Sequence, residues 1–158
     1  MRRRARTIGV AWGLVHALAG TPRVHAEGAA TPELETYAIA QDAIATPLGG
    51  QRGDPARGQE LLEARHRSLC ILCHAAPSVP EPFRGTLAPS LDGIGARLSE
   101  GQIRLRIVDM KRLNPDSLMP RYYAIREGVR VAPAWTGKPL LDAAEIEHLV
   151  AYLVTLKE

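Results

Sequence analysis

The chain has 158 residues and a mass of 17.2 kDa, enough for one small domain with a segment to spare. Aromatic residues make up only 4% of it, so the core has little large apolar surface of its own. The formal charge of +3 arises before position 27, where five arginines stand without an acid; residues 27–158 hold 15 basic and 17 acidic residues, a net of −2. That balance gives no indication of a nucleic-acid partner.

The first 26 residues have the three-part layout of a secretory signal peptide. Arginines at positions 2, 3, 4 and 6 form a basic start, an apolar run follows from Ile8 to Ala19, and Val24-His25-Ala26 is suited to a signal peptidase. The apolar run is too short for a membrane anchor. We therefore expect export to the periplasm, cleavage near Ala26 and no membrane span in the mature protein.

Residues 27–52 are rich in Ala, Thr, Pro and Gly. Thr31-Pro32 favours the start of a helix, Leu34 and Ala38 would give it an apolar side, and Gly49-Gly50 breaks the pattern. We interpret 27–52 as an N-terminal extension: a weak helix, then an extended arm that lies on a surface and docks a partner. A disordered leader is the alternative.

Two helices are predicted early in residues 53–158. Asp54 can cap the first and Pro55 can occupy its first position, and Leu61 with Leu62 carries its apolar side to about Arg67. The second spans about 100–110. It begins at Ser99 and Gln102, which form a capping-box pattern ahead of an apolar run.

The third predicted helix has the clearest pattern. Asp142 and Glu145 form a cap-and-box pair, and apolar residues follow at helical spacing: Ile146, Leu149, Val150, Leu153 and Val154. Proline-rich and glycine-rich stretches separate the three helices, and no strand pattern competes with them. The fold class is therefore all-α, three main helices joined by long loops.

The strongest chemical signal is Cys70-Ile71-Leu72-Cys73-His74. The pattern C-x-x-C-H is typical of c-type haem attachment, in which Cys70 and Cys73 form thioethers with the porphyrin and His74 ligates the iron. A thioredoxin-like dithiol would need a βαβ context, and a zinc site would need further ligands. A structural disulfide leaves His74 without a role. We therefore predict one covalent haem c.

Met119 is the preferred sixth ligand of the iron. Pro120 biases it towards extended backbone, so a loop methionine could reach a haem face, and methionine opposite histidine raises the haem potential. Met110, at the end of a helix, is the other methionine after position 26. His66 and His148 are expected on helix surfaces, and either would give a bis-histidine site.

Three residues are predicted to line the haem pocket. The second ring nitrogen of His74 needs an acceptor, and the Pro89 carbonyl is the candidate. Leu91 would then lie against the ring. The indole N–H of Trp135 would bond a haem propionate, with a core anchor between loop and last helix as the equal alternative.

The chain resembles class I cytochromes c over about 53–158. The resemblance rests on four segments: Gly53–Gly58, Cys70–His74, Leu118–Pro120 and Val150–Leu153. It implies a class I cytochrome c fold in which the first and last helices cross at Gly58, against Leu149 or Tyr152.

A narrower resemblance is to the SoxX family, the small monohaem cytochromes of the sulfur-oxidising (Sox) system. It rests on the arm Asp42–Leu48 and four later segments: Arg97–Glu100, Arg104–Asp109, Arg112–Asp116 and Val131–Pro139. It implies a heterodimer with a larger SoxA-type cytochrome that couples thiosulfate to a cysteine of a carrier protein. It also implies His74 and Met119 as axial ligands and a downstream acceptor cytochrome. Alone, the chain would have no catalytic residues, because Cys70 and Cys73 are its only cysteines.

Two other functions remain open at this point. A free-standing periplasmic electron shuttle is the alternative, and a haem enzyme such as a peroxidase would need an open iron position. Residues 97–130 hold eight basic and four acidic side chains. We interpret this excess as a positive rim beside Met119 that guides an acidic partner.

Overall fold

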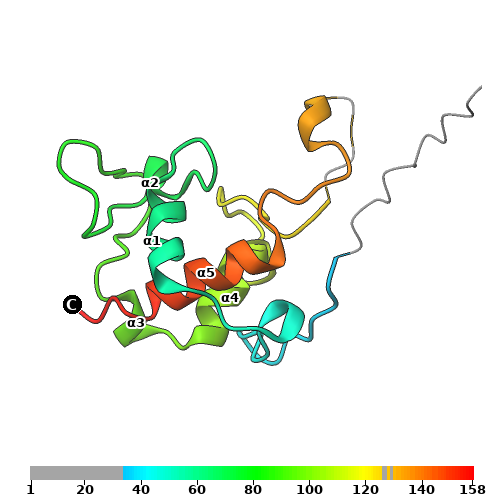
Figure 1. The fold of residues 1–158 in the computed structure, drawn as a ribbon, viewed down its shortest axis with the longest axis horizontal. Coiled ribbons are helices and arrows are strands. Elements are labelled where there is room, and N and C mark those ends of the chain that lie inside the picture. The colour runs from blue at the N-terminus through cyan, green and yellow to red at the C-terminus, as the bar shows by residue number, and fades with distance from the viewer. Residues whose placement is uncertain (1–33, 126–127, 129) are drawn as a thin grey trace, which may run out of the picture. The chain divides into compact units, whose positions relative to one another are not determined.

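The computed structural model describes residues 34–125, 128 and 130–158. Within these residues the protein is helical, without any strand, and the predicted all-α class is confirmed. Its helices, in order, are η1 (Leu48–Gly50), α1 (Pro55–Glu63), α2 (Cys70–Cys73), α3 (Ile94–Arg97), α4 (Glu100–Asp109), η2 (Met110–Arg112), η3 (Pro133–Trp135) and α5 (Ala143–Leu153). The three predicted main helices correspond to α1, α4 and α5 (Figure 1).

The predicted capping residues are all in use. The Asp54 carboxylate accepts from the backbone N–H groups of Ala56 and Arg57 at the start of α1. Complete capping boxes begin the other two main helices, formed by Ser99 with Gln102 at α4 and by Asp142 with Glu145 at α5. These bonds satisfy N–H groups that a helix start otherwise leaves without partners.

The predicted end of the first helix, near Arg67, is wrong. α1 ends at Glu63, and the N–H groups of both Arg67 and Ser68 bond to the Ala64 carbonyl in a turn. Leu69 then adopts a left-handed conformation, with φ of 63°. The chain reverses here to begin α2, although the apolar spacing of Leu61 and Leu62 would allow further helix.

α1 and α5 cross in direct contact, and Gly58 is the reason they can approach (Figure 1). A Cβ atom at Gly58 would lie 1.9 Å from the His148 carbonyl oxygen and 2.7 Å from the Tyr152 Cβ. No side chain fits in that space. The crossing predicted at Gly58 is therefore confirmed, with His148 and Tyr152 as its partners on α5.

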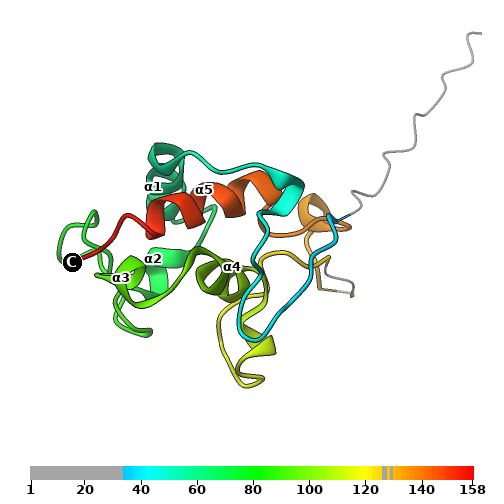
Figure 2. The same cartoon turned by 90° about the horizontal axis from the view of Figure 1, so that it is seen from below.

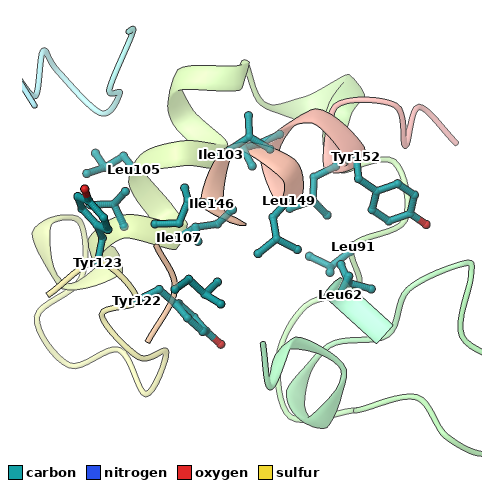
Figure 3. Close-up of a cluster of buried hydrophobic side chains, with 14 of the residues drawn as sticks. Leu62, Leu91, Ile103, Leu105, Ile107, Tyr122, Tyr123, Ile146, Leu149 and Tyr152 are labelled. Carbon is teal, nitrogen blue, oxygen red and sulfur yellow. The ribbon is translucent and has the colours of Figure 1, made fainter. Parts of the chain in front are cut away.

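The hydrophobic core lies between α1, α4 and α5 (Figure 3). Ile103 and Leu105 from α4 and Ile146 and Leu149 from α5 are almost fully buried. Tyr122 and Tyr123 add two aromatic rings from the loop after α4. Beyond α5, the chain ends beside α3, where the Gly95 N–H donates to the Leu156 carbonyl (2.8 Å; Figures 1 and 2).

Residues 40–50 form an arm that packs beside α4 and the start of α5 (Figures 1 and 2). Ile44 and Leu48 are buried, and the Ile44 N–H donates to the Gly101 carbonyl at 3.0 Å. Residues 34–39 are not helical, so the predicted weak helix is wrong over its described part. The hydrogen bond from the Glu35 N–H to the Tyr123 hydroxyl (2.8 Å) ties this non-helical segment to the fold.

The predicted signal peptide, residues 1–26, lies outside the described residues, as do residues 27–33. Residues 31–158 group into one unit, so the arm and the helices after it belong to the same body. None of the helices in the described part of the chain has the length and apolar character needed to cross a membrane.

Candidate haem site

The five residues of the C-x-x-C-H motif form a single helical turn and its exit. α2 spans Cys70–Cys73, and His74 leaves it in extended conformation while its N–H bonds to the Cys70 carbonyl. The His74 Nδ1 lies 2.7 Å from the Pro89 carbonyl oxygen. Because a carbonyl only accepts, Nδ1 carries the proton, and Nε2 is left as the basic nitrogen of the ring. The predicted contact between His74 and Pro89 is present.

The loop that supplies Pro89 is bonded to the motif on both sides of His74. The Ala88 N–H donates to the Cys73 carbonyl and the Leu91 N–H to the Ala75 carbonyl, each at 2.9 Å. Gly85 lets the loop approach, since a Cβ there would lie 2.5 Å from the Cys73 carbonyl carbon. The imidazole is therefore oriented by the Pro89 carbonyl, and that carbonyl is held in place by backbone bonds on both sides of His74.

Both cysteines are free thiols and partly accessible. Burial raises the pKa of the Cys70 thiol, although hydrogen bonds from Ser68 and Tyr122 oppose that shift. The Tyr122 hydroxyl also donates to the Ser68 carbonyl at 2.6 Å, which joins the loop after Met119 to the turn before Cys70. Sequence reasoning missed Ser68 and Tyr122, because nothing in their local pattern indicates a contact across 54 positions.

Met119 and its neighbour Leu118 differ sharply in exposure. Met119 is partly buried and packs on the hydrophobic core, whereas Leu118 is 85% exposed. The loop therefore turns its methionine inward. Met110, the alternative, begins η2 and is not among the residues that pack on the core.

The two histidines considered as ligands differ in their surroundings. His66 is exposed in the turn after α1, not on a helix as predicted. The His148 Nδ1 accepts from the Asp54 N–H at 2.8 Å, which ties α5 to the start of α1. His148 thus has a structural contact at the crossing of the two helices.

The remaining predicted pocket residues differ in their surroundings. Leu91 is buried in the same core cluster as Leu62 (Figure 3). Trp135 lies outside that cluster, and its ring stacks with the Arg67 guanidinium, 5.4 Å from the ring centroid. Arg67 in turn bonds the Glu145 carboxylate of α5. Trp135 therefore links its loop to the last helix through Arg67, not through the core as the anchor interpretation supposed.

Arg67 and Trp135 also line a cavity of about 370 Å³. Tyr123 and Lys138 are among the other residues in its wall. Burial raises the pKa of the Tyr123 hydroxyl, and the hydrogen bond from the Glu35 N–H partly offsets this.

The positive rim is smaller than the sequence count suggests. Arg104, one of the eight basic residues, is buried and paired with Glu147. Arg112 and Arg121 are both within ion-pair distance of Asp109. Asp109 is already among the four acidic residues of this segment, so the Arg104–Glu147 pair alone lowers its net charge, from +4 to +3.

The residues around α2 fit a covalently bound haem. Two unpaired thiols stand one helical turn apart, and the adjacent imidazole has its distal nitrogen available. Within the described ranges, no three Cys, His, Asp or Glu side chains gather as a metal cluster would require. Thiols and imidazole at this spacing suit a haem better than a bare metal ion.

Comparison with known proteins identifies the family. No family model matches the chain, and no curated protein matches it. Among solved structures, the chain is similar to the crystal structure of SoxXA from P. pantotrophus, with 34% identity and a TM-score of 0.69. The match covers 77% of this chain and 95% of the other. The chain has a cytochrome c fold and belongs to the SoxX/SoxA-type cytochromes.

Proposed function

We propose that this protein is the small, SoxX-type monohaem subunit of a periplasmic SoxAX heterodimer, and that it transfers electrons. Its two cysteines can attach one haem c and no more. No thiol remains for sulfur chemistry, so thiosulfate coupling to the carrier protein belongs to the larger partner. The match over 95% of one SoxXA chain supports a subunit of that complex.

The observation that carries the proposal is the hydrogen bond between His74 and Pro89. It fixes the imidazole with Nε2 as the only basic nitrogen, directly after two free thiols. A haem bound here supplies a one-electron ferric–ferrous couple. The Pro89 carbonyl keeps the imidazole oriented and electron-rich, which strengthens it as a donor to iron.

The other residues have distinct proposed roles. Cys70 and Cys73 would hold the haem covalently, Met119 would ligate its iron together with His74, and Leu91 would lie against the ring. The Trp135 indole N–H would donate to a propionate. Six ligands around the iron would exclude small molecules, which suits electron transfer and disfavours a peroxidase.

The first experiment tests the complex. The holoprotein is mixed with a larger Sox cytochrome and run on size exclusion, and thiosulfate plus carrier protein is then added. Co-elution followed by haem reduction here supports the subunit role. If the protein elutes alone and its haem stays oxidised, the free-standing electron shuttle replaces it.

The second experiment tests the ligands. Ferric haem bound to a methionine sulfur has a weak absorption band at the red end of the visible spectrum. We expect this band at neutral pH, and we expect Met119→Ala to abolish it while Met110→Ala retains it. The opposite pattern would assign the sixth position to Met110.

A further inference from the structure

The loop that carries Met119 leaves and re-enters the fold at adjacent points. It starts where α4 ends, at Asp109, and returns at Arg121. The Arg121 Nε donates to the Asp109 Oδ2 at 2.9 Å. This ion pair closes the neck of the loop, two residues from the proposed iron ligand.

Asp109 is built into the fold, unlike an ordinary surface partner. Its side chain is only 5% exposed, whereas that of Arg121 is 50% exposed. The other carboxylate oxygen, Oδ1, accepts from the Lys111 backbone N–H at 3.2 Å, and the Arg112 Nε lies 3.7 Å from Oδ2. A carboxylate held by several donors is a fixed point on which a mobile arginine can be positioned.

A second cross-link lies within the loop. The Lys111 Nζ donates to the Ser117 carbonyl at 2.7 Å and to the Pro115 carbonyl at 3.3 Å. The Ser117 hydroxyl accepts from the Met119 N–H at 3.2 Å. Lys111 and Ser117 therefore fix the backbone of Met119 from one side, as the neck does from the other.

Beyond Arg121 the chain continues along α4. The Tyr122 N–H approaches the Ile107 carbonyl and the Tyr123 N–H approaches the Val108 carbonyl, each at 3.4 Å. These backbone contacts are long, so the loop rejoins the fold through two shorter bonds: the charged Asp109–Arg121 pair and the buried bond from the Tyr122 hydroxyl to the Ser68 carbonyl.

From these contacts we infer that Asp109, through Arg121, is a positioning residue that holds Met119 against the haem iron. This inference rests on the proposed role of Met119. With the neck closed, the loop cannot swing its methionine away without breaking a charge-assisted bond to a buried carboxylate. Weakening the neck raises the population in which Met119 has left the iron.

The test is the binding of imidazole to the ferric holoprotein, because imidazole enters only when the methionine is displaced. Asp109→Asn keeps the size of the side chain and removes its charge. We expect its apparent imidazole affinity to rise about tenfold, the size of a partly exposed charged hydrogen bond. Arg121→Gln should act similarly, and Arg121→Lys should restore most of the wild-type affinity.

Asp116→Asn is the matched control. Asp116 lies exposed in the same loop, and its contact is a backbone one, the Asp116 N–H to the Asn114 side chain. The substitution makes the same chemical change without touching the neck. Equal imidazole affinity in Asp109→Asn, Asp116→Asn and wild type would overturn the inference.

Amide hydrogen exchange in the holoprotein separates this inference from the ligand assignment. Asp109→Asn should speed exchange at Ser117 and Met119, and Asp116→Asn should not. If Met119→Ala leaves the red absorption band unchanged, Met119 is not the iron ligand and the inference is wrong. This holds even if amide hydrogen exchange shows that the Asp109–Arg121 pair orders the loop. If the band depends on Met119 but Asp109→Asn leaves amide exchange unaltered, the ligand assignment stands and the positioning role of Asp109 is wrong.

Discussion

Arg104 and Glu147 form a buried ion pair that holds the arm as well as each other. Two hydrogen bonds of 2.7 and 2.8 Å join the guanidinium to the carboxylate. The same guanidinium donates to the Ile44 carbonyl at 2.7 Å, and the same carboxylate accepts from the Leu48 N–H at 3.0 Å. α4, α5 and the arm therefore meet at one pair of charges.

Glu147→Gln should destabilise the protein strongly. The substitution leaves the Arg104 charge buried without its counter-ion, which costs about 3–5 kcal/mol. Urea unfolding of the holoprotein measures the loss. Glu60→Gln, an exposed position on α1, should change the free energy of unfolding by less than about 0.5 kcal/mol. Similar values for the two variants would show that the pair does not stabilise the fold.

Gly58→Ala should separate the first helix from the last. The added Cβ would meet the His148 carbonyl at 1.9 Å, and the backbone there cannot yield without moving a helix. We expect the free energy of unfolding to fall by about 3 kcal/mol or more. This is the upper end of the range for substitutions that place an extra group in a packed core. Gln59→Ala, exposed beside it, is the control and should be nearly neutral. A neutral Gly58→Ala would contradict the crossing.

Tyr123 should make stability fall at alkaline pH. Burial raises its pKa above the ordinary 10.0, and the nearby charges of Glu35 and Asp142 add to the shift. The folded state then keeps the phenolic proton to a higher pH than the unfolded state. This contribution is complete below pH 10 and is lost as the pH rises through the raised pKa. Unfolding at several pH values should show a smaller alkaline loss for Tyr123→Phe; an identical loss would exclude Tyr123 as its source.

Salt should slow electron transfer only modestly. The sequence places a net charge of +4 in residues 97–130, and the pairing of the buried Arg104 with Glu147 reduces this excess to +3. We expect the rate with an acidic partner to fall by less than about tenfold between low and physiological ionic strength. Stopped-flow mixing at several salt concentrations measures it. A much steeper decline of the rate with salt would show that the positive rim guides the acidic partner.

Local features were predictable from the sequence pattern, whereas long-range contacts were not, apart from the crossing at Gly58 that the family resemblance implied. The caps at Asp54, Ser99 and Asp142 could be read directly, since each acts within three residues. The contact of His74 with Pro89 was also predictable, because a ligand imidazole needs an acceptor and the following loop offers a carbonyl.

The errors have a common physical cause. Arg104 was counted as a surface charge because its partner, Glu147, is 43 positions away and belongs to another helix. A weak helix was predicted for the N-terminal extension because local propensity favours one, whereas the Glu35 N–H is bonded to Tyr123, 88 positions away, in a non-helical segment. Tertiary contacts of this kind override local preference and have no periodic signal.

The attachment of the arm has a consequence for the order of folding. Leu48 reaches Glu147 across 99 positions, the widest separation among the hydrogen bonds described above, and α5 lies at the end of the chain. Contacts between such distant residues form late, because the loop between them must first be closed. Until α5 has been synthesised and docked, Leu48 lacks its partner Glu147, and the arm is held by the contacts of Ile44 with α4. A chain that stops short of α5 would therefore leave the arm unanchored at Leu48, and proteases should cut there first.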